Sequence, residues 1–432
     1  MAIFDSITRI LWGNWSGTWY KGAACLLPDV WMSSAKLPGT VAFVAQPTLW
    51  HDYCTSNKVA GRCQNRASSL VVGSQALRLP CRCPKSAYRV PFYELRATPA
   101  TIGGSINLTP NALRLLEYLD VEVYGCRVDS IEIFSLHTGA VLGELPFQKF
   151  GPALRILREE LLQALLRAAE KRGIPVVYNS KLMSIKDDRR DLQVTAVFAN
   201  GKEVQGDFIL GCDGVHSAEN GIKAHFRRTS MNSGRFGSLL ASYVDSDRTK
   251  IYLGAVMETP EQNDKQGWKV RGNDHQRTLD EIERRYNGSG IPCINELVER
   301  VDDFVFYPVH NLGPGGDWSR GRVLLLGDTA HGMPPQGEST GLAIEDGVLL
   351  ARVLSSSSEM SIQQAFQMYE KTRRPRIDTA YKEAVFRWEK VKDRSWLMQN
   401  IIEWLTWVFL WYKLNGFETS ISYDVRQEKI IE

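Results

Sequence analysis

One stretch of the chain combines an acidic turn, two prolines and several glycines in an order that suits ligand binding. Residues 321–347 read GRVLLLGDTAHGMPPQGESTGLAIEDG. The apolar run before Gly327 predicts a strand, and we expect a helix to begin near Thr340. A strand that ends in Asp328, with a helix N-terminus close by, brings a carboxylate and free backbone N–H groups around one point. Such a point suits a ligand that carries hydroxyls and polar ring edges.

A second motif of the same kind lies upstream. Residues 206–217 read GDFILGCDGVHS, an apolar strand that runs into Gly-Cys-Asp-Gly. The glycines allow the backbone to approach a pyrophosphate, and Asp213 can accept a hydrogen bond from a ribose or from a nicotinamide partner. Each motif alone also fits a simple turn between strand and helix, with Asp213 or Asp328 in solvent. Together, and in this order, they favour a nucleotide-cofactor site.

Two earlier segments add polar groups that such a cofactor needs. Residues 90–94, VPFYE, end a short strand in Glu94. An acid at the tip of the second strand of a doubly wound sheet can bond the hydroxyls of an adenosine ribose. Residues 102–121 give a glycine turn that includes Gly104, and then a helix with Thr109 as its N-cap and a proline at its first position.

Arg158 opens a second amphipathic helix. The sequence LREELLQALLRAAEKRG has apolar residues at helical spacing and closes at Gly173. A guanidinium held at this point can bond a pyrophosphate or a ribityl oxygen. The alternative is an arginine on a solvated helix face.

These motifs, in this order, resemble those of the FAD-dependent aromatic hydroxylases, the salicylate-hydroxylase-like single-component flavoprotein monooxygenases. The resemblance covers roughly residues 88–217 and 238–424. It implies that Asp328 bonds the ribityl chain of FAD and that the loop from Pro334 to Gly341 lies along the flavin ring. The full set of cofactor-binding residues that it implies is Glu94, Gly104, Arg158, Asp213, Asp328 and Gly341.

The resemblance also implies a fold. This is an α/β fold in which a doubly wound, Rossmann-like sheet binds FAD, a β-rich substrate domain is inserted, and the C-terminus is helical. A chain of 432 residues exceeds one ordinary core, in agreement with two packed domains. We expect the FAD-binding domain at residues 71–217 and 305–385, a shortened substrate domain at 218–304, and a C-terminal helical region at 386–432.

Three apolar or alternating runs predict strands of the substrate domain, at residues 238–244, 251–257 and 304–310. Tyr243 and Tyr252 lie on these strands, where tyrosine more often serves packing than catalysis. His331 follows the Gly-Asp turn, and we expect it to order the flavin loop rather than to act as a general base. The sequence identifies no catalytic base.

The first seventy residues depart from the family pattern. An FAD domain of this kind opens with a strand, a glycine-rich turn and a helix, because the pyrophosphate sits on the helix N-terminus. Counted back from Glu94, the turn falls near residues 71–76, VVGSQA, where only Gly73 matches. Prolines disfavour a regular helix over residues 77–86. Residues 1–70 hold five of the twelve tryptophans but no sustained hydrophobic period, so we expect them to pack poorly against the rest.

For function, the resemblance implies hydroxylation of an aromatic, usually phenolic, small molecule by O₂, with FAD as cofactor and NAD(P)H as co-substrate, in secondary metabolism. Two alternatives stay open. With its pyrophosphate turn lost, the chain could be a non-catalytic remnant that binds no FAD. The same scaffold could also serve a flavin oxidase or dehydrogenase. The motifs do not identify the substrate, the position hydroxylated or the choice between NADH and NADPH.

Composition argues against several other classes of protein. A net charge of +3 is too small to indicate a nucleic-acid partner. Residues 1–15 lack the basic start and long apolar run of a secretory signal, so we expect a cytoplasmic protein whose eight cysteines are reduced. Cys81 and Cys83 have no second pair at finger-like spacing, which argues against a metal site.

Residues 396–414, WLMQNIIEWLTWVFLWYKL, are rich in tryptophan. Their longest uncharged run is far below the roughly twenty apolar residues that span a bilayer. Three interpretations stay open: a helix packed on the catalytic body, an interfacial helix in contact with a membrane surface, or a dimer surface. Packing on the body is the ordinary expectation.

Overall fold

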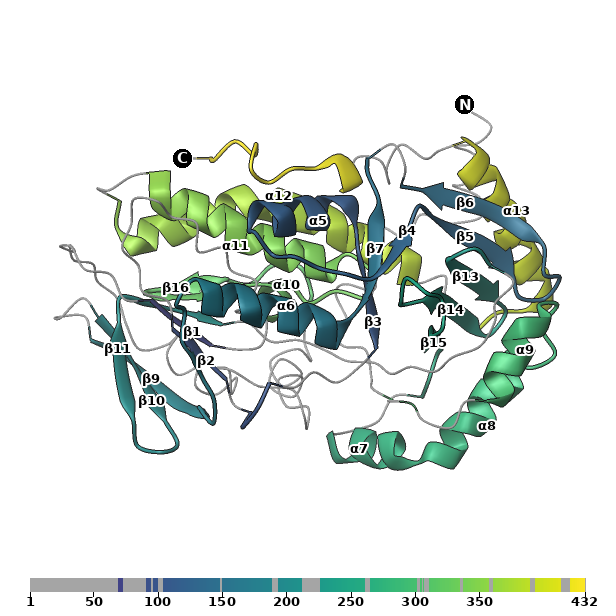
Figure 1. Cartoon of the computed structure of the whole chain (residues 1–432), viewed down its shortest axis with the longest axis horizontal. Coiled ribbons are helices and arrows are strands. Elements are labelled where there is room, and N and C mark those ends of the chain that lie inside the picture. Colours follow the sequence, from purple (N-terminus) through teal and green to yellow (C-terminus); the bar gives the residue numbers. More distant parts are fainter. Residues whose placement is uncertain are drawn as a thin grey trace, which may run out of the picture.

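The computed structural model describes residues 69–72, 91–94, 96–99, 104–147, 150–188, 193–211, 226–260, 265–300, 304, 306, 311–334, 337–356, 360–388, 393–412 and 420–431. This part of the chain forms several sheets covered by helices, with the helical C-terminal region at one end (Figure 1). Several predictions concern other residues and lie outside the described ones: Asp213, the turn at Gly73, the segment 77–86, Cys81 with Cys83, and residues 1–68.

A six-stranded sheet forms the base of the FAD-binding domain. Its order is β16-β17-β12-β1-β2-β8, and every neighbouring pair from β17 to β8 is parallel. Its central strands are short apolar runs, which is typical of parallel strands covered on both faces. The bounds are β1 (Ser69–Val72), β2 (Phe92–Tyr93), β8 (Val176–Val177), β12 (Phe208–Gly211), β16 (Ser319–Arg320) and β17 (Val323–Leu325).

The central position of β1 corrects one expectation. β1 pairs with both β12 and β2, so Ser69 and Leu70 are part of the main sheet. The prediction that residues 1–70 pack poorly is therefore wrong for these two residues. The expectation was wrong because it placed only the glycine-rich turn, near residues 71–76. A fold of this kind also needs a strand directly before that turn, and β1 is this strand.

A three-stranded antiparallel sheet, ordered β3-β7-β4, carries two of the predicted helices. α5 (Pro110–Tyr118) follows β3 (Ser105–Leu108) and has Pro110 at its start, as predicted. β7 (Ala153–Leu157) runs directly into the predicted helix α6 (Arg158–Lys171). Gly173, just past α6, has a φ of +65°, the left-handed conformation of a glycine that ends a helix. The third strand is β4 (Cys126–Val128).

The substrate domain is built on a five-stranded sheet ordered β15-β14-β13-β5-β6. β14 and β15 confirm two of the three predicted strands. The third, at 304–310, lies mostly outside the described residues, and Phe304 and Phe306 belong to no strand. The bounds are β5 (Ser130–Ser135), β6 (Val141–Pro146), β13 (Thr229–Gly234), β14 (Gly237–Tyr243) and β15 (Ile251–Val256).

The substrate sheet draws on two stretches of the chain. β5 and β6 come from residues assigned above to the FAD-binding domain, and β5 pairs in parallel with β13. Hydrophobic alternation identifies a strand but does not say which sheet it joins, so the sequence did not indicate this arrangement. Helices α7 (Lys265–Asn273), α8 (His275–Tyr286) and α9 (Pro292–Glu299) follow β15, and α8 and α9 share a hydrophobic core with the sheet.

Beyond these layers, β9 (Leu182–Asp188), β10 (Gln193–Phe198) and β11 (Glu203–Gly206) form an antiparallel sheet at the far end of the FAD-binding domain (Figure 1). Two long helices, α11 (Ser339–Ser356) and α12 (Ile362–Trp388), join α5 in the largest hydrophobic core. α11 is buried on almost every side because its residues are small or apolar all round. The C-terminal segment lies along these helices, with Val425 buried.

Helix α13 (Trp396–Tyr412) packs on the substrate sheet. Leu410 sits on Gly143 of β6, where a Cβ would come within 2.6 Å of the leucine side chain. One face of this helix therefore packs on the body of the protein, as the first of the three interpretations predicts. Among the described helices, none combines the length and the apolar character that crossing a membrane requires.

Candidate active site

The carboxyl ends of the parallel strands meet at one edge of the six-stranded sheet, which is where ligands bind in open α/β sheets. Glu94 follows β2 directly, and Asp328 comes shortly after β17. β1 lies between β12 and β2, so the chain leaves β1 where the strand order reverses. Asp213, which follows β12 in sequence, lies outside the described residues. The two described acids therefore come from strands that end at the same edge.

Glu94 is fixed at this edge by its backbone. Its N–H donates to the carbonyl of Val177 at 2.8 Å, and its own carbonyl accepts from the N–H of Ser180 at 2.8 Å. The side chain is 8% exposed, and its Oε1 accepts from the N–H of Arg96 at 3.1 Å. Burial, together with the Glu94 charge, raises the pKa of the neighbouring Tyr178. The carboxylate is thus held next to the tip of β2.

Asp328 opens the single-turn helix α10 (Asp328–His331). The residue before it, Gly327, has a φ of +60°, a left-handed conformation that glycine adopts without steric cost. The N–H of Gly327 donates to Oδ2 of Asp346 at 2.7 Å, and this contact is buried. The turn that presents the half-buried Asp328 is therefore held from α11 by a second carboxylate.

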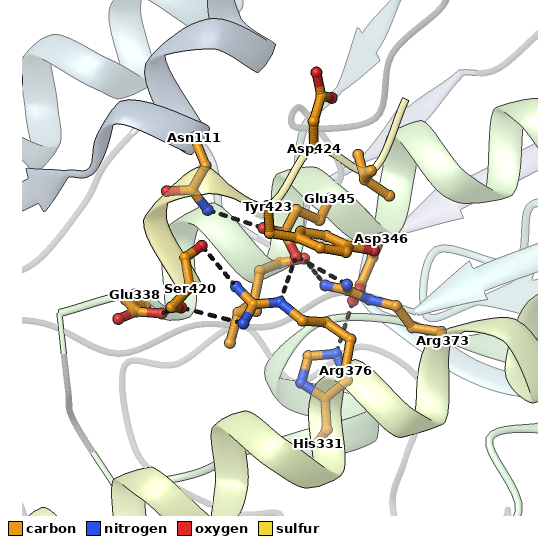
Figure 2. Close-up of polar contacts among 12 residues, drawn as sticks. Asn111, His331, Glu338, Glu345, Asp346, Arg373, Arg376, Ser420, Tyr423 and Asp424 are labelled. Atoms are coloured by element: carbon orange, nitrogen blue, oxygen red, sulfur yellow. Dashed lines mark hydrogen bonds and ion pairs between the residues drawn. The ribbon is translucent and has the colours of Figure 1, made fainter. Parts of the chain in front are cut away.

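Asp346 is the centre of a buried polar network (Figure 2). Besides Gly327 it bonds Nε2 of His331 at 2.8 Å and Nε of Arg373 at 2.7 Å. Arg373, on α12, also donates to Glu345 at 2.8 Å and to the carbonyl of Leu342 at 2.9 Å. All three guanidinium nitrogens thus have partners, which is the condition under which a buried charge is tolerated.

The charges in this network stabilise one another. Burial by itself would raise the pKa of Asp346, but His331 and Arg373 lower it, and the result lies well below the usual range of an aspartate. Burial would lower the pKa of Arg373, but Asp346 and Glu345 raise it above its usual value. Both side chains are therefore ionised in the folded protein.

Further contacts extend the network to α5 and to the C-terminal segment. Asn111, in the first turn of α5, donates to Glu345 at 2.9 Å. Arg376 lies 3.6 Å from Glu345 and donates to Oγ of Ser420 at 3.1 Å, and that hydroxyl donates to Glu338 at 2.7 Å. The network thus joins α5, α11, α12 and Ser420 (Figure 2).

Sequence reasoning missed this network. The available signal was an adjacent acidic pair, Glu345 and Asp346, in the middle of an otherwise apolar helix. Acidic residues at such positions are rarely buried without a partner, so they predict a buried cation elsewhere.

Three more predicted residues surround β3. The N–H of Arg158 donates to the carbonyl of Gly104 at 3.0 Å, so the glycine turn and the start of α6 are in direct contact. A Cβ on Gly341 would lie 3.4 Å from Ala112 and 3.6 Å from Oγ1 of Thr109, which shows that the first turns of α11 and α5 pack together. The structure therefore joins Gly104 to Arg158 and places Gly341 against the N-terminus of α5.

Other candidates have structural partners. His331 is buried, bonds Asp346 and packs against Trp318, with ring centroids 5.4 Å apart. Its Nε2 is thus committed to the network, in agreement with a role in ordering the loop. Tyr243 lies in the core of the substrate domain, as expected for a packing residue. The Tyr252 ring folds back over Gly254 of its own strand.

The residues present fit FAD. Oγ1 of Thr109 is buried without a partner in the described part of the chain. Thr109 precedes α5 but makes no side-chain capping bond. This hydroxyl lies at the N-terminus of α5, against the first turn of α11. A dinucleotide with a pyrophosphate, two polyhydroxyl chains and a ring with polar edges supplies the partners that such groups lack.

Comparison with known sequences gives the same assignment. Residues 148–286 and 313–384 match the family described as FAD binding domain. A 6-hydroxynicotinate 3-monooxygenase from Bordetella bronchiseptica is 24% identical over 384 residues, which cover 81% of this chain and 92% of that protein. A 3-amino-4-hydroxybenzoate 2-monooxygenase, PtmB3, from Streptomyces platensis is 25% identical over 398 residues, which cover 82% and 94%.

A solved structure has the same fold. HpxO from Klebsiella pneumoniae, complexed with FAD and uric acid, gives a TM-score of 0.67 at 19% identity and covers 82% of this chain and 96% of that one. The predicted α/β fold class, with its FAD-binding sheet, β-rich substrate domain and helical C-terminus, is thereby confirmed. The FAD-binding match and the monooxygenases among its relatives show that this chain is similar to the FAD-dependent aromatic monooxygenases and that FAD is its cofactor.

Proposed function

We propose that this protein hydroxylates a phenolic small molecule with O₂, using NAD(P)H as the reductant, in secondary metabolism. The observation that carries the proposal is the position of Glu94 and Asp328 after parallel strands that end at one sheet edge, in a chain that matches FAD-binding domains. When bound, FAD supplies the transfer of electrons from NAD(P)H and the activation of O₂.

The residues of this chain would then bind and orient FAD and shield the reacting ring from water. Glu94 accepts hydrogen bonds from the adenosine ribose, and Asp328 accepts them from the ribityl chain. Arg158 and the Gly104 turn hold the pyrophosphate side of the cofactor, and the N–H groups near Gly341 face the flavin ring. Asp213, which follows β12 in the sequence, would add an acceptor. The substrate sheet covers the flavin and excludes water from the reacting ring.

The remnant alternative has less support than the enzyme. β1 supplies the strand that must precede a pyrophosphate turn, and it lies at the centre of the sheet. The polar network behind Asp328 is fully paired around Asp346 and Arg373. A hydroxylase transfers one oxygen atom of O₂ to its product, whereas an oxidase or dehydrogenase on the same scaffold does not. This difference can be measured directly.

The test uses purified protein with NADPH or NADH and isotopically labelled O₂. Hydroxybenzoates and hydroxypyridines serve as trial substrates, and the products are analysed by mass spectrometry. We expect one labelled oxygen atom in the product and oxidation of one NAD(P)H for each product molecule. Substrate oxidation without labelled oxygen in the product would replace the hydroxylase assignment by an oxidase or dehydrogenase.

We also propose that α13 makes peripheral contact with a membrane surface. One side of this helix packs on β6, but large apolar side chains on the other side face solvent. They are Leu397, Trp404 and Trp407, exposed by 63%, 59% and 49%, at positions that share one helix face. Tryptophan and leucine on the outward face of an amphipathic helix suit the headgroup region of a bilayer.

Sedimentation with phospholipid vesicles tests this contact. We expect the wild-type protein to pellet with vesicles and the triple variant Leu397→Ser, Trp404→Ser, Trp407→Ser to stay in the supernatant, because the apolar area that enters the headgroup region is lost. Flavin content serves as the control for folding. Wild-type protein that stays in the supernatant, or that elutes as a dimer which the variant abolishes, would assign this face to another role.

A further inference from the structure

Arg155, on β7, is a buried arginine that has no acidic partner among the described residues. Its side chain is 4% exposed, and Nε is enclosed with no hydrogen-bond partner in the described part of the chain. The guanidinium of Arg373 is equally buried, yet it bonds two carboxylates and a carbonyl. An enclosed cation with no such partners is costly, and a protein retains one where a ligand completes the site.

The neighbours of Arg155 on the same face are polar, and they too lack partners within the part of the chain that the structure describes. Arg155 stands directly opposite Asn107 of β3, and Ile156 stands opposite Ile106. Ile106 and Ile156 point into the main hydrophobic core, so the alternation of strands turns Asn107 and Arg155 to the other face. Oδ1 of Asn107 is buried without a partner, as is Oγ of Ser105 two residues earlier. Three unpartnered polar side chains thus share one sheet face.

This face looks toward the substrate domain. β7 lies between β3 and β4, so Arg155 pairs with Asn107 on one side and with Cys126 of β4 on the other. Cys126 belongs to the hydrophobic core of the substrate sheet. The phenol of Tyr252, on β15, is close enough to raise the pKa of Arg155 slightly. Burial is the larger effect and lowers this pKa to about 10, so the side chain still carries its charge at neutral pH. The arginine is therefore a fixed positive charge between the FAD-binding and substrate domains.

We propose that Arg155, with Asn107 and Ser105 beside it, binds a carboxylate of the aromatic substrate and makes the enzyme selective for aromatic acids. A guanidinium bonds a carboxylate through two parallel N–H groups, and Nε with one terminal nitrogen forms such a pair. The Nδ2 group of Asn107 and the hydroxyl of Ser105 add donors around the same group, whereas Oδ1 of Asn107 can only accept. The inference rests on the proposed hydroxylase function, because it assigns Arg155 to the substrate of that reaction.

The test compares acids with their neutral amides on the flavin-containing protein. Benzoate, salicylate and 4-hydroxybenzoate are titrated by calorimetry, alongside benzamide, salicylamide and 4-hydroxybenzamide. We expect the wild type to bind at least one acid more tightly than its amide. In Arg155→Met we expect affinity for that acid to fall about tenfold to a hundredfold, as when a hydrogen bond to a charged group is lost, while affinity for the amide changes little. Arg155→Lys should restore part of the preference.

A stability measurement separates this role from a structural one. Arg155→Met should raise Tm in the absence of ligand, because it replaces an uncompensated buried charge by an apolar side chain. The matched control Arg373→Met should lower Tm, because it leaves two buried carboxylates without their cation. A wild type without any preference for acids, or an Arg155→Met variant that keeps the preference or melts earlier, would overturn the proposal. Flavin content and labelled-oxygen incorporation report on the proposed function independently.

Discussion

Replacing Asp346 by alanine is expected to cost about 3–5 kcal/mol of folding stability, the range for a buried ion pair broken from one side. The carboxylate bonds the N–H of Gly327, the ring of His331 and the guanidinium of Arg373, and none of these gains another partner in the variant. Thermal unfolding should show Tm lower by about 3–6 °C. Because Gly327 precedes Asp328, residual folded protein should also bind FAD more weakly.

Two further measurements make this prediction specific. Glu296→Ala breaks an exposed ion pair with Arg300 and should change stability by less than about 1 kcal/mol. The pKa of Asp346 is depressed in the folded state, so its contribution is fully present above about pH 4 and is lost as the pH falls through the folded-state pKa. Wild-type protein should therefore lose more stability on acidification than Asp346→Ala. Equal Tm values for Asp346→Ala and Glu296→Ala would contradict the central role of Asp346.

Replacing Asp328 by alanine is expected to abolish tight flavin binding while the fold is largely retained. A carboxylate that accepts hydrogen bonds from ribityl hydroxyls contributes about 1.5–3 kcal/mol, or roughly tenfold to 150-fold in affinity. Asp328 itself is only half-buried and lies at the start of a one-turn helix, so its loss leaves the Asp346 network intact. The readout is flavin retained through extensive dialysis.

Asp213→Ala is the comparison for this experiment. The glycines around Asp213 can keep the shape of its turn without the side chain, so we expect a smaller loss of flavin than for Asp328→Ala. Circular dichroism of both variants checks that the fold is retained. An Asp328→Ala protein that stays yellow through dialysis would contradict the proposed contact between Asp328 and the ribityl chain.

The sequence predicted the features that depend on local order along the chain. Glu94 and Asp328 are predicted to bind the cofactor because each follows an apolar run, and the structure shows that both runs are parallel strands of one sheet. Their contacts with the cofactor stay a prediction. The helix after Thr109 and the helix that begins at Arg158 were predicted from capping residues and apolar spacing, and the structure confirms both.

The contacts between distant residues could not be read in the same way. Arg373 and Asp346 lie 27 positions apart, and only the packing of α12 on α11 brings them within 2.7 Å. Arg155 reads in sequence as one more charge in an alternating strand, and only the pairing of β7 between β3 and β4 shows that it is enclosed. Likewise, the alternation in β5 and β6 gave no sign of which sheet they join.

The most direct test of the account is the visible spectrum of the purified protein. If Glu94, Arg158 and Asp328 form a site for FAD, the protein should carry close to one flavin per chain, with absorbance bands in the near-ultraviolet and the blue, and should regain FAD after its removal. A folded, colourless protein that does not bind added FAD would contradict the claim that these three residues form a site for FAD.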